Sequence, residues 1–129
     1  MLKRVDFSIL LGKTLLSCKV ISAYGKNVLQ FTTTGNETFR MCHEQDCCES
    51  VYIQDITGDL NDLLNTPILQ AEEVSSRDTP IDIDTPYDEG SYTWTFYKLA
   101  TIKGSVTIRW FGTSNGYYSE SVSLYKCDP

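Results

Sequence analysis

Hydrophobic and polar residues alternate along most of this chain, which is the period expected of β-strands that bury one face. Between residues 13 and 23, Leu16, Cys18 and Val20 fall on one side of the predicted strand. Turn sequences separate it from two further segments that are rich in β-branched and aromatic residues. We therefore predict an antiparallel meander of three strands, at residues 13–23, 28–33 and 38–42.

The middle of the chain mixes strand and helix signals. Ile53, Ile56 and Leu60 recur at helical spacing, but Val51 and its neighbours favour a strand and Gly58 interrupts a helix. A second short helical turn is expected between an Asp6 cap and Gly12. The segments predicted here are a strand at 50–56, a helix at about 59–65, a strand at 68–74 and an exposed acidic loop at 75–90.

The last forty residues carry the strongest strand signal. Threonines alternate with aromatic residues over 91–102, and Val106, Ile108 and Trp110 share one face of the next segment. Asn115-Gly116 is typical of a two-residue hairpin turn, so we predict a final strand at 117–125 that returns beside it. The fold class predicted for the single domain 1–129 is α+β, dominated by an antiparallel β-sheet meander with one or two short helices.

Length and charge narrow the class of protein. A chain of 129 residues can bury a core of its own, and its net charge of −6 disfavours direct binding to nucleic acid or to an anionic membrane. No segment has the length and apolarity of a membrane span, and the N-terminus lacks a secretory pattern. We therefore expect a cytoplasmic protein whose five cysteines are reduced thiols.

Cys42, His43, Cys47 and Cys48 form the most chemically suggestive cluster. Zinc binds thiolates and imidazoles, but adjacent cysteines rarely reach one ion together and the usual paired spacing is missing. A nucleophilic cysteine beside His43 is disfavoured because the neighbouring carboxylates oppose a thiolate. We expect no metal or other cofactor, and we interpret the cluster as a structural joint that fixes the meander against the rest of the sheet.

Flat rings and one guanidinium gather in the last strands. Rings can stack on a nucleobase and arginine binds phosphate, whereas the competing interpretation is that tryptophans fill the core and tyrosine hydroxyls reach its rim. A hairpin tip rarely buries all of its side chains, so part of this group is expected to be exposed. The residues predicted to bind a ligand are Trp94, Tyr97, Arg109, Asn115, Tyr117 and Tyr118.

Several segments together are similar to a known family. They are HEQDCCESVYI at 43–53, SYTWTFY at 91–97 and RWFGTSNGYYS at 109–119, and the resemblance extends from about Leu11 to Val122. The chain resembles an uncharacterised family of small proteins of tailed bacteriophages and prophages. The resemblance implies a setting, the cytoplasm of an infected bacterium, and transfers no catalytic residue.

The function expected from this setting is binding without catalysis. The first hypothesis is a homo-oligomeric protein that counters host defence by sequestering a small nucleotide-type immune signal through the aromatic and arginine side chains. The second is an inhibitor that binds a host defence protein through an acidic and aromatic surface. The third is a zinc- or thiol-dependent factor that uses the cluster at 42–48.

Overall fold

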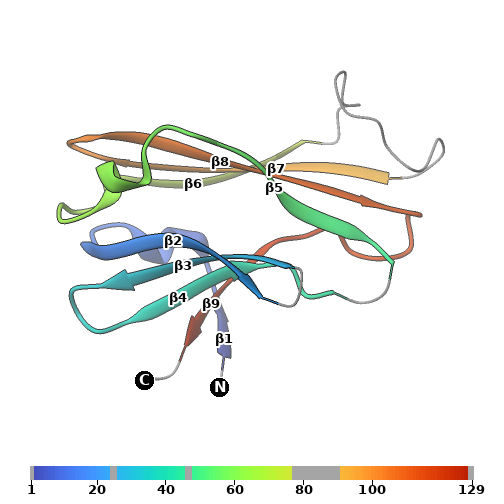
Figure 1. Ribbon diagram of the computed structural model, residues 1–129, viewed down its shortest axis with the longest axis horizontal. Helices are drawn as coiled ribbons and strands as arrows, with labels where there is room; N and C mark the ends of the chain where they lie inside the picture. The colour runs from blue at the N-terminus through green and yellow to red at the C-terminus, as the bar shows by residue number, and fades with distance from the viewer. Residues whose placement is uncertain (1, 24–25, 46–47, 77–90, 128–129) are drawn as a thin grey trace.

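The computed structural model describes residues 2–23, 26–45, 48–76 and 91–127. These residues form two antiparallel sheets, one of five strands and one of four, that lie in two layers (Figure 1). The predicted dominance of antiparallel sheet is confirmed. Both expected helices are present as single 3-10 turns, η1 (Phe7–Leu10) and η2 (Leu60–Leu63), so the described chain is essentially all-β.

The five-stranded sheet contains the predicted meander, because β2, β3 and β4 pair in sequence. The first strand, β1, was not predicted: it is short and three of its four residues are exposed, so it carries no alternating pattern. In sheet order the strands are β1 (Leu2–Val5), β9 (Ser123–Cys127), β4 (Thr38–Cys42), β3 (Lys26–Thr33) and β2 (Leu15–Ala23).

The four-stranded sheet is built around the long β7–β8 hairpin, whose strands pair from Ser91–Ser114 to Thr101–Gly104. The prediction of an exposed loop at 75–90 is corrected at its start, because residues 75 and 76 belong to a strand; residues 77–90 lie outside the described residues. In sheet order the strands are β5 (Ser50–Thr57), β8 (Gly104–Ser114), β7 (Ser91–Thr101) and β6 (Gln70–Ser76).

The predicted hairpin at Asn115-Gly116 is wrong in its partner. The turn itself is present, since Asn115 Oδ1 accepts a hydrogen bond from the Tyr117 amide at 3.0 Å and Gly116 has φ +93°. However, β8 already has β5 on one side and β7 on the other, so neither edge is open to a returning strand. The chain instead crosses to the five-stranded sheet, where β9 pairs with β1 and β4. We call residues 115–122 the crossover segment.

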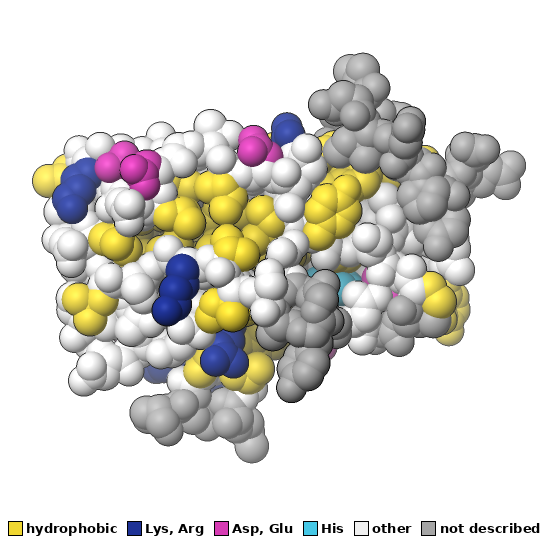
Figure 2. All heavy atoms as spheres, viewed as in Figure 1, with side chains coloured by type: hydrophobic (Ala, Val, Ile, Leu, Met, Phe, Trp, Pro, Cys, Tyr) yellow, Lys and Arg dark blue, Asp and Glu magenta, His cyan; other side chains and the backbone are white. Residues whose placement is uncertain are grey.

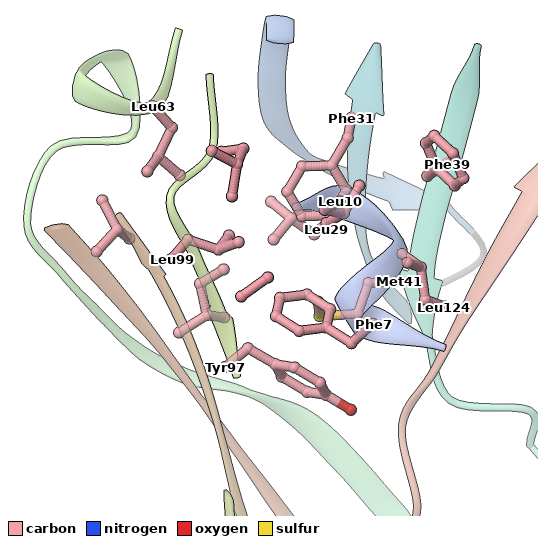
Figure 3. Packing of buried hydrophobic residues seen from close by; sticks show 14 of the residues in the cluster. Phe7, Leu10, Leu29, Phe31, Phe39, Met41, Leu63, Tyr97, Leu99 and Leu124 are labelled. Atoms are coloured by element: carbon pink, nitrogen blue, oxygen red, sulfur yellow. The ribbon is translucent and has the colours of Figure 1, made fainter. Parts of the chain in front are cut away.

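Side chains from both sheets and from η1 meet in one core between the layers (Figure 3). The Asp6 carboxylate caps η1 by accepting from the Ser8 amide, as predicted, and the turn directs Phe7 and Leu10 into the core. Phe7 packs on Tyr97 with ring centroids 4.7 Å apart. Burying each of the two η1 side chains contributes about 1.5–3 kcal/mol, so this single turn anchors the link between β1 and β2.

A β-bulge changes which residues of β2 are buried. Cys18 and Val20 face the same side as their buried partners in β3, as predicted, but the register shifts between Leu15 and Ser17. Leu15 therefore takes the fully buried position, and Leu16 is 52% exposed, contrary to the prediction.

One side of the sandwich leaves part of its core uncovered. Figure 2 shows hydrophobic side chains gathered in a band along the middle of this face, between the sheet that contains β5 and the sheet that contains β2. Both strands are sheet edges, and Ile53 and Ile56 of β5 are only partly buried against the core. In the described part of the chain, no helix has the length and apolarity needed to cross a membrane.

We predict that Glu37 adds a small, pH-dependent stability. Lys13 Nζ lies 2.7 Å from Glu37 Oε1 and Lys126 Nζ lies 3.2 Å from Oε2, and the hydrogen bond from Lys13 is the largest cause that lowers the pKa of Glu37 below 4.5. Because the folded pKa is depressed, the contribution is present above pH 4.5 and is lost as the pH falls through the folded pKa. Glu37→Gln should lower the free energy of unfolding at neutral pH by less than about 1 kcal/mol, because the pair is partly solvated. Urea unfolding on both sides of pH 4.5 measures this, and a pH-independent loss would contradict the prediction.

Candidate functional site

The structure separates the six residues that the sequence groups into one ligand site. Successive residues of β7 point to opposite faces of the sheet. Trp94 and Tyr97 are three positions apart, so they lie on different sides of that strand. The outer face of the four-stranded sheet carries Trp94 and Arg109, the inner face carries Tyr97, and the crossover segment carries Asn115, Tyr117 and Tyr118.

The Arg109 and Trp94 side chains contact each other and are further engaged by neighbouring side chains. The guanidinium lies over the indole ring at 5.1 Å from its centroid, and Arg109 Nε donates to Gln54 Oε1 at 2.6 Å. Trp94 also packs on Phe111 at 4.4 Å, and these two side chains are only 8% and 1% exposed. Since the arginine already covers the ring, a nucleobase has no free face of Trp94 on which to stack. Trp110 lies in the core between the sheets, as the competing interpretation proposed.

Hydrogen bonds to side chains of β7 and β8 hold the crossover segment in place. Glu120 is 8% exposed, and its carboxylate accepts hydrogen bonds from Thr93 Oγ1 at 2.7 Å and from the Ser114 hydroxyl. The backbone carbonyl of Val122 accepts from the Tyr97 hydroxyl at 3.1 Å. Charge-assisted hydrogen bonds to a buried carboxylate are among the stronger ones in proteins, so Glu120 fixes the height of this segment above the sheet.

His43 ties the crossover segment to the linker between β4 and β5. Its Nδ1 lies 2.6 Å from the carbonyl oxygen of Ser121, and its Nε2 lies 2.8 Å from Glu49 Oε2. A carbonyl only accepts, so Nδ1 carries a hydrogen, and one further proton is shared between Nε2 and the carboxylate. Both links between the two sheets thus meet at one buried ring. The joint expected from the sequence was to fix the meander within one sheet, whereas this ring connects segments that link two sheets.

A cavity of about 400 Å³ opens beside the crossover segment. Tyr97 and Phe7 contribute its aromatic wall, and its charged residues are Arg4 of β1, Glu73 of β6 and Asp6. Burial, and then the Glu73 carboxylate, raises the pKa of Tyr97, so its hydroxyl stays protonated. The single hydrogen of this hydroxyl is shared between the Val122 carbonyl oxygen at 3.1 Å and Glu73 Oε1 at 3.2 Å. Arg4 is exposed and makes no ion pair or hydrogen bond with another described residue, so its guanidinium is available to an anion.

A second cavity, of about 450 Å³, lies on the other side of the segment. Its walls are rich in hydroxyl groups, and Tyr118 adds an aromatic ring next to Tyr117, with centroids 5.0 Å apart. The two cavities share Glu73, Ser121 and Val122, so they adjoin. The hydroxyl-bearing residues that line the second cavity are Ser75, Ser76, Ser91, Thr93, Thr95, Ser119 and Ser121, besides Tyr118.

The two adjoining cavities form the candidate site, and four of the residues that build it were not found from the sequence. Glu73, Thr93 and Glu120 are polar residues in three different segments, and Arg4 lies in β1, a strand that the pattern did not reveal. No local motif relates them, because strand pairing over long sequence separations brings them together. Of the predicted residues, Tyr97 and Tyr118 line the cavities, whereas Trp94 and Arg109 do not.

The cysteine and histidine cluster offers no free ligand set. Both ring nitrogens of His43 are engaged, so neither can bind a metal ion without breaking the joint. Cys42 is not in a disulfide, and Cys47 lies outside the described residues. Cys48 is disulfide-bonded, which corrects the expectation that it is reduced. Within the described ranges no three His, Cys, Asp or Glu side chains gather around a possible metal position.

Cys18, far from this cluster in sequence, is no better as a nucleophile. Burial raises the pKa of its thiol to about 12, so it is protonated at neutral pH.

Comparison with known proteins gives one result. The model of a family described as a domain of unknown function, DUF7448, matches residues 8–124. The searches of curated proteins and of solved structures found no match.

Proposed function

The chain belongs to the DUF7448 family, and from this premise we propose that it is a non-enzymatic binding protein that holds a small nucleotide-type ligand in the two adjoining cavities beside the crossover segment. The observation that carries the proposal is the guanidinium of Arg4, which makes no ion pair or hydrogen bond with another described residue and lies at cavities whose walls also carry tyrosine rings, hydroxyl groups and the carboxylates of Asp6, Glu73 and Glu120. Arginine matches the geometry of a phosphate group, and tyrosine rings can stack on a base.

The dimensions of the site support this ligand class. Sites for small molecules commonly have volumes of roughly 300–1,000 Å³, and the adjoining cavities of about 400 and 450 Å³ fall in that range. Phosphate would lie against Arg4, because this guanidinium lines the first cavity, whereas no lysine or arginine is among the described residues that line the second. The nucleoside would then extend past Ser121 towards Tyr118.

The biological setting is proposed from the sequence resemblance to small phage and prophage proteins. A phage protein that retains a nucleotide signal in the cytoplasm of an infected bacterium would counter host defence by sequestration. The resemblance and the family match cover nearly the same residues, 11–122 and 8–124. The expected homo-oligomer stays a prediction, which light scattering of the purified protein tests.

An inhibitor of a host defence protein is the second candidate. Tyr117 is 83% exposed on the crossover segment, and tyrosine is enriched at protein–protein interfaces. The acidic surface of this hypothesis rests on the net charge of −6, and seven of the 17 acids lie outside the described residues. Loss of a captured host protein on Tyr117→Ser, with nucleotide binding absent, would favour this candidate.

The test of the nucleotide proposal compares two neighbouring cations. Arg4→Ala should weaken the binding of nucleoside monophosphates and cyclic dinucleotides at least about tenfold, because the charge-assisted contact to phosphate is lost. Lys3→Ala removes the same charge from the adjacent position of β1, which does not line the cavities, and should have little effect. Titration calorimetry measures both variants.

Two further results bear on the proposal. Mass spectrometry of small molecules released from heated protein, purified from infected cells, should return an unchanged nucleotide. Equal losses of affinity in Arg4→Ala and Lys3→Ala, or failure of wild-type protein to bind any nucleotide of the panel, would contradict it.

A further inference from the structure

The second cavity presents hydrogen-bond acceptors to whatever occupies it. Glu73 uses Oε1 to accept from Tyr97, and its Oε2 makes no hydrogen bond to another described residue. Glu120 holds its carboxylate at the same cavity, bonded within the described residues only to the two neutral hydroxyls of Thr93 and Ser114. None of the described residues that line this cavity is a lysine or an arginine. The groups of a ligand that fit here are therefore donors.

Several wall hydroxyls add flexible partners to these acceptors. Ser75, Ser91 and Thr95 make no side-chain hydrogen bond within the described part of the chain, so their hydroxyls can turn towards a ligand. A hydroxyl can donate and accept at once, which suits a sugar, whose own hydroxyls do the same. Phosphate oxygens only accept and carry charge, so they are disfavoured next to the two carboxylates.

The position of Glu73 decides which part of a nucleotide meets these groups. It lines both cavities, with Arg4 in the first and Tyr118 in the second. Between the phosphate and the base of any nucleotide lies the sugar, so a ligand that spans from Arg4 to Tyr118 places its sugar beside Glu73. A carboxylate accepts hydrogen bonds from vicinal ribose hydroxyls, as acidic residues do in dinucleotide-binding folds.

We infer that the carboxylate of Glu73, supported by the hydroxyl-lined wall, recognises the ribose of the ligand and makes the site selective for ribonucleotides over deoxyribonucleotides. This inference rests on the proposed nucleotide-binding function and adds the sugar specificity of the same site. Glu73 acts by direct hydrogen bonding to ligand hydroxyls, and a deoxy ligand leaves a desolvated acceptor without its partner.

The experiment uses the full chain and defined probes. The probes are the 5′-monophosphates of adenosine and guanosine with their 2′-deoxy and 2′,3′-dideoxy forms. The wild-type protein should bind each ribo form about tenfold more tightly than the deoxy form, since a site built to bond a hydroxyl rejects the analogue that lacks it. Glu73→Ala should reduce this ratio to about one, whereas Arg4→Ala should weaken all forms and leave the ratio unchanged.

The matched control is Glu72→Ala. Glu72 is the exposed neighbour of Glu73 on β6 and faces the opposite side of the strand, so its loss should change neither affinity nor selectivity. Equal binding of ribo and deoxy forms by wild-type protein, or selectivity that survives in Glu73→Ala, overturns the inference and leaves the binding function standing. Absence of binding to every probe overturns both.

Discussion

Replacing His43 with alanine is expected to lower the free energy of unfolding by about 3–5 kcal/mol, the cost typical of removing one partner from a buried ionic pair. The ring and the Glu49 carboxylate are 8% and 4% exposed, and their atoms lie 2.8 Å apart. Without the ring, the buried carboxylate loses this partner, and the Ser121 carbonyl loses its donor at 2.6 Å. Urea unfolding at neutral pH measures the effect.

Two further variants test whether the loss of stability comes from the His43–Glu49 pair or from any substitution in the linker between β4 and β5. Glu44→Ala alters the adjacent, exposed residue and should cost less than about 1 kcal/mol. The double variant His43→Ala with Glu49→Ala should be less destabilised than the two single losses combined, because the second change removes the carboxylate that the first deprives of its histidine partner. If His43→Ala costs no more than Glu44→Ala, the ring does not act as the joint between the sheets.

Glu49→Gln tests whether the pair needs its charge. A glutamine amide can donate to Nε2 of a neutral ring while Nδ1 still donates to the Ser121 carbonyl, so the geometry of the joint can survive without an ion pair. We expect this variant to retain more stability than His43→Ala, because it leaves hydrogen bonds in place and removes the buried charge.

Most strands could be predicted because their side-chain pattern is local. Phe39 and Met41 of β4, and Val106, Ile108 and Trp110 of β8, alternate with polar neighbours and are all buried as expected. The destination of the last strand could not be predicted, since the turn at Asn115-Gly116 is the same whether the chain returns beside β8 or leaves its sheet. That choice depends on both edges of β8 being occupied, which is a property of the whole sheet.

The candidate site was predicted less well than the fold for a related reason. Aromatic and arginine residues close in sequence suggested one surface, but alternation along β7 places Trp94 and Tyr97 on opposite faces. Arg109 interacts with Trp94 and Gln54, whereas Arg4, more than a hundred positions earlier, has no hydrogen bond or ion pair with another described residue. Charge and ring content thus led to the hypothesis of a ligand site, and strand pairing determines which residues line the cavities.

Gly58→Ala is expected to destabilise the protein by about 3–5 kcal/mol, through backbone strain combined with overpacking. Gly58 follows β5 with φ +103°, a conformation that residues with a side chain rarely adopt. A Cβ atom there would lie 2.5 Å from the backbone oxygen of Ser105 and 3.3 Å from Val106 Cα. Because these atoms belong to β8, in the centre of its sheet, relief would require the strand to move or the pairing of β5 to loosen.

Gly12→Ala separates the cost of backbone strain from the cost of overpacking. Gly12 also has a positive φ, +81°, but an added Cβ would meet no atom within 4 Å, so only the conformational cost of about 1–2 kcal/mol remains. Thermal and urea unfolding of both variants should show the larger loss at Gly58, and failure of the Gly58 variant to fold while the Gly12 variant folds agrees with the same account. Equal losses would mean that β8 accommodates the methyl group at no energetic cost. That result would contradict the close contact between Gly58 and β8 on which the prediction rests.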